Sequence, residues 1–309
     1  MPFEVTILGS SSATPTSTRY PSAQLVNLLG RFFLLDCGEG TQIQLRRYGF
    51  KIQKIQYICI SHLHGDHYLG LIGLLSTMSL LNRKKEITIF APKGIKKILD
   101  LHFKLSYSEL SYPLRIIPLK GSALHKIFED EYFELFSFGL KHRIPCWGFK
   151  LIEKKRPRKL IKSAIDKYNI PFNYFQSIKS GSDYLTPNKK VIKNELITLE
   201  SYTPRSYAYC SDTIYFEKII KHVFEVDLLY HEATFHSNMS KKARSTFHST
   251  AREAALVAKN ANVKALLLGH FSSRYKDLSI LQEDAKIIFS NVNLAVEGSK
   301  WKINKSKLL

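Results

Sequence analysis

Cysteine is scarce in this chain of 309 residues. The four cysteines, Cys37, Cys59, Cys146 and Cys210, lie far apart, and no two of them form a C-x-x-C pair. This spacing argues against a thiolate zinc site and against a framework of disulfides. It favours a protein that works in a reducing compartment, and we expect the cytoplasm.

Long apolar runs are also missing. No stretch reaches the roughly 18 apolar residues that a membrane-spanning helix needs. The first residues, MPFEVTILGSSSATP, lack both the charged segment and the long apolar segment of a signal peptide, and instead predict a strand followed by a Gly/Ser turn. We therefore expect neither a membrane span nor a secreted protein.

Acidic residues are few relative to basic ones. The chain has 26 Asp+Glu against 46 Lys+Arg, which gives a formal net charge of +20. Such an excess predicts a polyanionic partner, and nucleic acid is favoured over a membrane surface because no amphipathic basic helix stands out. A lysine-rich composition shared across the source genome is the alternative explanation.

Strands and helices alternate in two halves of the chain, as in RFFLLDC and KALLLGH for strands and TAREAALVAKNA for a helix. The alternation breaks near Lys150. Residues 141–162 contain nine Lys/Arg and one Glu, and a turn-rich stretch follows. We interpret residues 150–197 as a basic insertion with little core of its own.

One short motif concentrates metal-binding side chains after the predicted strand YICIS. It reads SHLHGDHYLG and contains His62, His64, Asp66 and His67. Alternate residues of an extended segment point the same way, so His62 and His64 can bind one ion. Asp66 and His67 lie on the turn that follows and can reach a second ion beside it.

Further donors follow other predicted strands: His142, Asp212 and His270. An acidic residue between two ions can bridge them, and Asp212 is the natural candidate. Imidazole and carboxylate without thiolate suit zinc, while manganese or another divalent ion stays possible.

With its later His, Asp and His, the H-x-H-x-D-H motif resembles the metallo-β-lactamase superfamily. Within it the chain resembles ribonuclease Z, the tRNA 3′-processing endonuclease, almost from end to end. The resemblance rests on the stretches ILGSSSATPT, DCGEGTQIQL, SHLHGDHYLGLIGLL, SDT, HEATF, HSTAREAA and LGHFSSRY. It implies an α/β (α+β) chain, a four-layer αββα sandwich formed by one domain over 1–309, with the 150–197 insertion as a flexible arm that binds tRNA.

The resemblance also implies a site with two zinc ions per chain. Carried across residue by residue, one ion takes His62, His64 and His142, the other takes Asp66, His67 and His270, and Asp212 bridges them. Asp66 then accepts the proton of the attacking water, His248 protonates the departing 3′ oxygen, and Glu232 orients His248. The stretch HST also predicts a helix N-cap at Ser249 or Thr250.

The expected activity is that of a zinc-dependent endoribonuclease, commonly a homodimer, which removes the 3′ trailer from precursor tRNA and leaves a 3′-hydroxyl. Two departures from the family pattern stand out: PTSTRY in place of P-x-K-x-R-N, and an insertion without the usual Gly-Pro element. The alternatives are a phosphodiesterase of the same fold that acts on small or cyclic phosphodiesters, and an RNA-binding protein without catalytic activity. The basic insertion argues against the first, and the intact set of ligands argues against the second.

Overall fold

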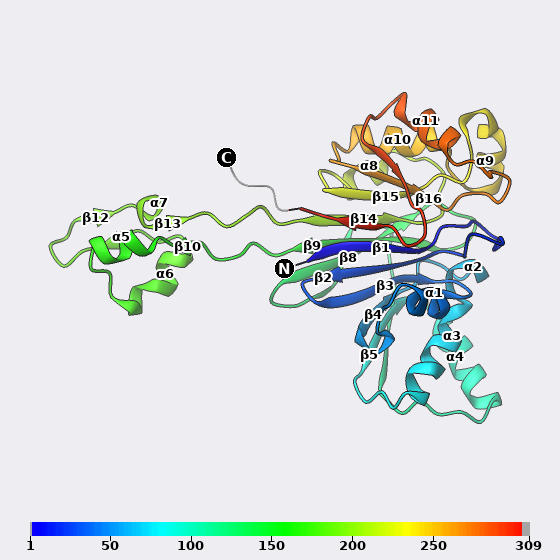
Figure 1. Ribbon diagram of the computed structural model, residues 1–309, viewed down its shortest axis with the longest axis horizontal. Coiled ribbons are helices and arrows are strands. Elements are labelled where there is room, and N and C mark those ends of the chain that lie inside the picture. The colour runs from blue at the N-terminus through cyan, green and yellow to red at the C-terminus, as the bar shows by residue number, and fades with distance from the viewer. Residues whose placement is uncertain (1, 305–309) are drawn as a thin grey trace.

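Two mixed β-sheets of seven strands lie face to face at the centre of the protein, in a computed structural model that describes residues 2–304 (Figure 1). The strand orders are β18-β1-β2-β3-β4-β5-β6 and β17-β16-β15-β14-β9-β8-β7. The first sheet comprises β1 Phe3–Gly9, β2 Ala23–Leu28, β3 Arg31–Cys37, β4 Ile55–Cys59, β5 Ile87–Ala91, β6 Leu114–Pro118 and β18 Lys300–Lys302. The second comprises β7 His125–Glu129, β8 Phe133–Leu140, β9 Cys146–Glu153, β14 Ser206–Cys210, β15 Leu228–Glu232, β16 Leu266–Gly269 and β17 Val292–Leu294.

Helices cover the outer face of each sheet (Figure 1). On the side of the first sheet are α1 Thr41–Arg47, η1 Ile52–Lys54, α2 Gly65–Tyr68, α3 Gly70–Leu80 and α4 Gly94–Leu105. On the side of the second are α8 Lys218–His222, η3 Ser237–Met239, α9 Ser240–Thr246, α10 Ala251–Asn260 and α11 Ser279–Lys286. No helix within residues 2–304 has the length and apolarity required to cross a membrane.

Three apolar cores hold these layers together. One lies between the sheets and contains Phe33, Phe149 and Tyr230. The other two lie between each sheet and its own helices. Apolar residues on both faces of the strands are what a sheet covered on both sides requires. The predicted four-layer αββα sandwich is confirmed.

The helix that follows HST begins at a well-defined cap. The Thr250 side chain accepts a hydrogen bond from the Glu253 amide, and the Glu253 carboxylate accepts one from the Thr250 amide. Such a capping box satisfies two amide groups that would otherwise lack partners, and an N-cap of this kind contributes about 1 kcal/mol. Of the two predicted caps, Thr250 is therefore the one observed.

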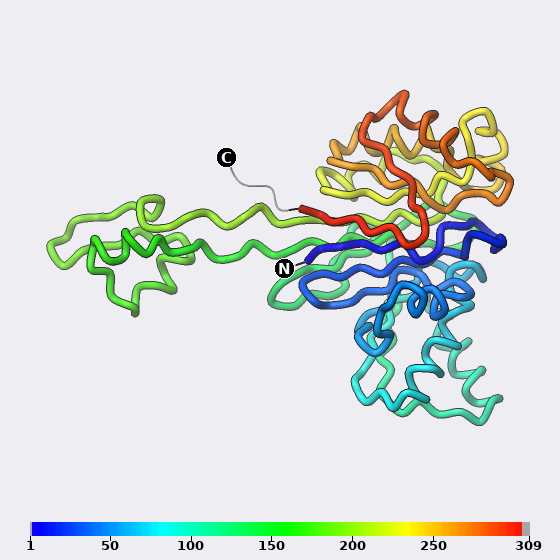
Figure 2. The backbone as a smooth tube through the Cα atoms, in the orientation of Figure 1, coloured from blue at the N-terminus to red at the C-terminus, as the bar shows by residue number. Residues whose placement is uncertain are grey.

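A segment between β9 and β14 projects away from the two sheets as an arm (Figure 2). It contains β10 Lys159–Leu160, α5 Lys162–Lys167, η2 Phe172–Tyr174, α6 Phe175–Lys179, β11 Tyr184–Leu185, β12 Val191–Ile192, α7 Asn194–Ile197 and β13 Thr198–Leu199. The expectation that this segment has little core of its own is wrong. Seven buried side chains, among them Ile165, Ile178, Tyr184 and Ile197, pack into a separate apolar cluster.

A buried ion pair closes the base of this arm. Arg205 donates from Nε and Nη2 to the two carboxylate oxygens of Glu153, at 2.9 and 2.6 Å, and both side chains are buried. Glu153 ends β9, and Arg205 directly precedes β14. The arm therefore leaves and re-enters the body at one point, whereas the predicted limits of 150–197 begin inside β9 and end before β14.

Candidate metal centre

The candidate ligands come together at one edge of the two sheets. His142 follows β8, Asp212 follows β14 and His270 follows β16, while His62 and His64 follow β4 of the other sheet. Strands β8, β14, β15 and β16 run in one direction, because β9 is antiparallel to both β8 and β14. Ligand sites in α/β sheets lie at the carboxyl ends of such strands.

The first cluster of donor atoms combines three histidines with one carboxylate. His64 Nδ1 lies 3.1 Å from His62 Nε2 and 3.2 Å from His142 Nε2. Asp212 Oδ2 lies 3.6 Å from His62 Nε2 and 3.8 Å from His142 Nε2. These four atoms surround one position.

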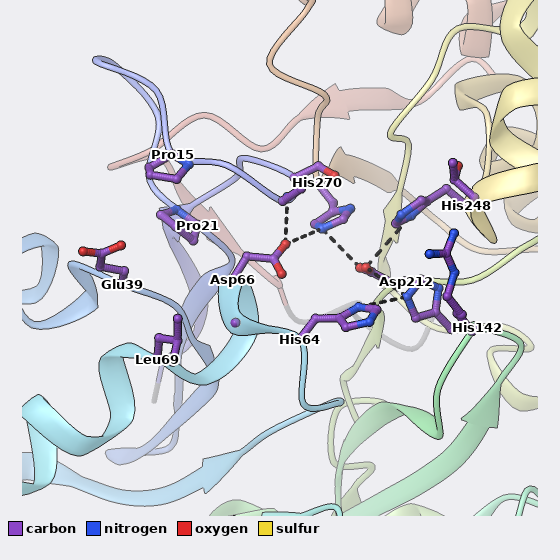
Figure 3. Close-up of a pocket in the computed structure, with 15 residues that line it drawn as sticks. Pro15, Pro21, Glu39, His64, Asp66, Leu69, His142, Asp212, His248 and His270 are labelled. Atoms are coloured by element: carbon purple, nitrogen blue, oxygen red, sulfur yellow. Dashed lines mark hydrogen bonds and ion pairs between the residues drawn. The ribbon is translucent and has the colours of Figure 1, made fainter.

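The second cluster uses the other oxygen of the same carboxylate. Asp212 Oδ1 lies 3.4 Å from His67 Nε2 and 3.2 Å from His270 Nε2. Asp66 Oδ2 lies 3.4 Å from each of these two nitrogens, which are 3.3 Å apart. The structure thus brings all seven predicted ligands together, with Asp212 between the two groups. Figure 3 shows the five of them that line the cavity, namely His64, Asp66, His142, Asp212 and His270.

The spacing of these atoms fits divalent ions. A tetrahedral site with ligands at about 2.0–2.1 Å separates its donor atoms by about 3.3–3.4 Å. Asp212 Oδ1 is buried and has no hydrogen-bond partner among the described residues, although a buried carboxylate oxygen needs one. An ion in the second cluster would supply that partner.

The charges of the two clusters also favour a cation. Despite burial, the pKa values of Asp66 and Asp212 are lowered by neighbouring histidines, so both carboxylates are ionised. Burial, together with the charge of His67, lowers the pKa of His62 and keeps that ring neutral. Despite burial, the carboxylates of Asp66, Asp212 and Asp36 raise the pKa of His67, so that ring must lose a proton when it binds an ion. Neutral imidazoles and ionised carboxylates are the forms that bind metal.

In three of the ligand histidines, Nε2 belongs to a cluster and Nδ1 forms a hydrogen bond that holds the ring in place. His142 Nδ1 donates to the Phe247 carbonyl oxygen at 2.8 Å, and His270 Nδ1 to Thr234 Oγ1 at 3.0 Å. His67 Nδ1 donates to Asp36 Oδ2 at 2.7 Å. Such bonds fix the tautomer and orientation of a metal-binding histidine.

Asp36 is a functional residue that sequence reasoning missed. It is fully buried at the end of β3 and has a left-handed φ of 55°, a conformation that is uncommon outside glycine. Its carboxylate also accepts hydrogen bonds from the Ser61 amide at 2.7 Å and from the Tyr209 hydroxyl at 2.6 Å. It therefore joins the metal-binding loop of one sheet to a strand of the other. The feature of the sequence that could have indicated this role is an acidic residue near the end of the apolar run RFFLLDC.

Beside the metal clusters, His248 and Glu232 form a hydrogen-bonded pair. His248 Nδ1 donates to Glu232 Oε1 at 2.8 Å. Glu232 also accepts hydrogen bonds from the Thr213 and Thr234 amides, at 3.0 and 3.1 Å, which fix its position. Although burial lowers the pKa of His248, the Glu232 carboxylate raises it, to about 9. His248 is thus protonated at neutral pH and can act as an acid.

A cavity of about 340 Å³ opens over this site. Figure 3 shows Asp212 at its centre, with His142 and His248 on one side and Pro15, Pro21 and Glu39 on the other. The complete lining is Ser12, Ala13, Pro15, Pro21, Glu39, His64, Gly65, Asp66, Leu69, His142, Arg143, Asp212, Thr246, His248 and His270. The cavity gives a substrate access to the proposed acid, to the proposed base and to ligands of both clusters.

Curated relatives match this chain over nearly its whole length. It is 44% identical over 296 residues to ribonuclease Z of Bacteroides fragilis, which covers 96% of this chain and 97% of the relative. It is 42% identical over 302 residues to ribonuclease Z of Bacteroides thetaiotaomicron, with 98% and 96% covered. The family model for the anti-Pycsar protein Apyc1 matches residues 3–134.

Two solved structures are similar to this chain over nearly its whole length. The human tRNase Z short form superposes with a TM-score of 0.72 and 31% identity, over 97% of this chain and 99% of that one. The metallo-β-lactamase fold protein YhfI of Bacillus subtilis has a TM-score of 0.69 at 19% identity, over 98% and 100%, and so shows the fold alone.

Proposed function

The chain belongs to the ribonuclease Z family, and on that premise we propose that it is a metal-dependent endoribonuclease that removes the 3′ trailer from precursor tRNA and leaves a 3′-hydroxyl. The observation that carries the proposal is the pair of donor clusters that share Asp212, one through each carboxylate oxygen. Zinc suits these clusters best, with two ions per chain, because their donors are imidazole and carboxylate groups at tetrahedral spacing. When bound, such ions would lower the pKa of a coordinated water and neutralise charge on the attacked phosphate.

Asp66 is proposed as the proton acceptor for the attacking water. Its Oδ2 belongs to the second cluster and also accepts a hydrogen bond from the Ala13 amide at 2.8 Å. No described residue hydrogen-bonds to its other oxygen, and the side chain lines the cavity. Because the pKa of Asp66 is lowered by His67 and His270 despite burial, the carboxylate is ionised, which is the form that can accept a proton.

His248 is proposed as the acid that protonates the departing 3′ oxygen. Since Nδ1 is bonded to Glu232, the opposite nitrogen, Nε2, is the one that can donate to substrate. Glu232 orients this ring and keeps it protonated. A positioned acid of this kind contributes roughly 10²- to 10⁴-fold in rate.

The arm is proposed to bind tRNA away from the scissile bond. Residues 150–200 contain 12 Lys/Arg and 5 Asp/Glu, and the arm holds none of the proposed metal ligands. Lysines spread over a small independently packed unit suit contacts to the RNA backbone, which supply affinity and register without reading bases.

A homodimer is proposed from an exposed apolar surface at the ends of α3 and α4. Leu80, Leu101, Leu105 and Tyr107 are exposed to 82%, 58%, 68% and 96%. The segment that follows α4 packs against the end of α3, because the Ser111 amide donates to Ser79 Oγ at 2.8 Å. Exposed apolar surface of this kind typically marks an interface. We also assign the protein to the cytoplasm, since all four of its cysteines are free.

The decisive experiment is incubation of the purified protein with 3′-extended tRNA, with and without a chelator, and mapping of the cut to the nucleotide. We expect a single cut after the discriminator base that the chelator abolishes and added zinc restores. Hydrolysis of small phosphodiesters without any cleavage of tRNA would refute the proposal.

A further inference from the structure

Arg143 is the one lysine or arginine among the 15 described residues that line the active-site cavity. It is exposed, and within residues 2–304 its guanidinium group has no hydrogen-bond or ion-pair partner. The same cavity is lined by the carboxylates of Glu39, Asp66 and Asp212. A cation that no local carboxylate neutralises, in a cavity for a polyanion, is available to a phosphate of the substrate.

The backbone that carries Arg143 is fixed on both sides. The Lys141 amide donates to Thr213 Oγ1 at 3.1 Å, and the Lys141 carbonyl oxygen accepts from the Ile214 amide at 2.9 Å. After the loop, the Trp147 amide donates to the Ser61 carbonyl oxygen at 3.0 Å. The backbone of Arg143 is therefore held in a defined position, while its side chain remains available to bind a ligand.

The position of Arg143 indicates which part of the RNA it meets. It directly follows His142, whose ring is bonded to the carbonyl oxygen of Phe247, the residue before His248. His248 and His142 lie on the same side of Asp212 (Figure 3). The proposed acid faces the departing 3′ oxygen, and that oxygen belongs to the tRNA product. The RNA on the 5′ side of the cut thus lies on the side of His248 and Arg143.

We propose that Arg143 binds the phosphate immediately 5′ of the discriminator nucleotide and thereby holds the end of the acceptor strand against the metal centre. This inference rests on the proposed cleavage of precursor tRNA. It assigns Arg143 a different task from the basic residues of the arm, although it belongs to the same basic stretch of sequence. Its guanidinium fork suits a phosphate oxygen pair, which a lysine contacts only as a point charge.

The first test compares Arg143→Ala with Lys141→Ala, which removes the same charge from the same loop but from a side chain that does not line the cavity. We expect Arg143→Ala to lower kcat/KM on precursor tRNA roughly 10- to 100-fold, as loss of a hydrogen bond to a charged group does. Arg143→Lys should recover part of the loss. Metal content and hydrolysis of bis(p-nitrophenyl) phosphate should stay unchanged in all three variants, because that substrate has no neighbouring phosphate.

The second test assigns the phosphate. Precursor tRNAs are made with one neutral methylphosphonate linkage, either immediately 5′ of the discriminator or after the first trailer nucleotide. With the wild-type protein, the 5′ methylphosphonate should lower kcat/KM by the same factor as Arg143→Ala does on unmodified tRNA. The two changes together should lower kcat/KM no further than either change alone. The methylphosphonate in the trailer should lower kcat/KM by the same factor with Arg143→Ala as with wild-type protein, so that the two losses add.

Two results would overturn the inference. One is an equal penalty for the 5′ methylphosphonate in wild-type and Arg143→Ala protein, which would show that Arg143 does not contact that phosphate. The other is a loss in Arg143→Ala matched by a loss of zinc or of bis(p-nitrophenyl) phosphate hydrolysis, which would make the residue structural. If wild-type protein failed to cut precursor tRNA at all, the proposed function would fail instead.

Discussion

Asp36 Oδ2 lies 2.7 Å from His67 Nδ1, and the same oxygen lies 2.6 Å from the hydroxyl of Tyr209, 173 positions away in the chain. One buried carboxylate therefore orients a proposed metal ligand in α2, after β4 of one sheet, and holds it to β14 of the other. The integrity of the metal centre and the packing of the two sheets depend on the same residue.

Asp36→Asn should weaken metal binding at the second cluster by roughly 10- to 100-fold, the usual effect of changing a residue that orients a ligand. An amide accepts a weaker hydrogen bond from His67 and leaves its own donors facing the Ser61 and Tyr209 donors. Competition with a chromogenic chelator measures the affinity. Asp227→Asn, which changes a carboxylate bonded to Ser206 and remote from the site, should bind metal normally.

Asp212→Ala should reduce occupancy of both metal positions together, because each of its oxygens belongs to a different cluster. By contrast, His142→Ala and His270→Ala should each affect mainly one position. Elemental analysis of dialysed protein tests this difference. One fully loaded position in Asp212→Ala would show that this carboxylate does not bridge.

His248→Ala should slow cleavage by roughly 10²- to 10⁴-fold while metal content and tRNA affinity stay nearly unchanged, since a positioned acid acts on the chemical step. Single-turnover rates provide the measurement. His236→Ala, at the half-buried N-cap of η3 and outside the cavity lining, is the matched control and should cleave like wild type. Normal single-turnover rates in His248→Ala would end its proposed role.

Glu232→Gln should move the alkaline limb of the pH–rate profile to lower pH. The Glu232 carboxylate raises the pKa of His248, to about 9, and the protonated ring is the form that donates. Activity therefore falls as pH rises through that pKa, and removal of the negative charge makes the fall begin earlier. An alkaline limb that stays in place would indicate that another group controls it.

Replacement of residues 156–202 by a short Gly/Ser linker should raise the tRNA concentration needed for cleavage and flatten the salt dependence of binding, because fewer counterions are released. This deletion keeps the Glu153–Arg205 ion pair, whereas a deletion that began inside β9 would leave Arg205 buried without the carboxylate of Glu153. Hydrolysis of bis(p-nitrophenyl) phosphate should persist, since all seven proposed ligands lie outside the deletion. Equal loss of both activities would mean that the arm supports the fold, and an unchanged tRNA affinity and salt slope would mean that it does not bind RNA.

Leu105→Glu should convert the proposed dimer to a monomer, because it places a charge in the exposed apolar surface at the ends of α3 and α4. Sedimentation velocity distinguishes the two states. Leu185→Glu, which changes an apolar side chain of the arm that is 54% exposed, is the matched control and should leave the state unchanged. A wild-type protein that sediments as a monomer would contradict the dimer itself.

The seven candidate ligands could be predicted because they lie in one short motif or follow predicted strands, whereas the four-layer fold was predicted from the resemblance to the metallo-β-lactamase superfamily. His142, Asp212 and His270 each follow an apolar strand, and parallel strands bring their ends to one edge. Asp36 could not be assigned in this way, since its role depends on Tyr209, a contact between two sheets that no local pattern records. The core of the arm was missed because its elements are too short for an apolar period to emerge, as in the six residues of α5.

The arm enters and leaves the body through β9 and β14, which are antiparallel neighbours in one sheet. The arm therefore connects β9 and β14 in the same way that a turn connects the two strands of a β-hairpin. The conformational entropy lost on closing such a loop rises only with the logarithm of its length, by about 0.6 kcal/mol for each doubling. An arm of roughly fifty residues thus costs the body only about 2 kcal/mol more than a turn of about six. Arms of very different length and sequence can accordingly be exchanged at this junction with little change in the free energy of unfolding of the sandwich.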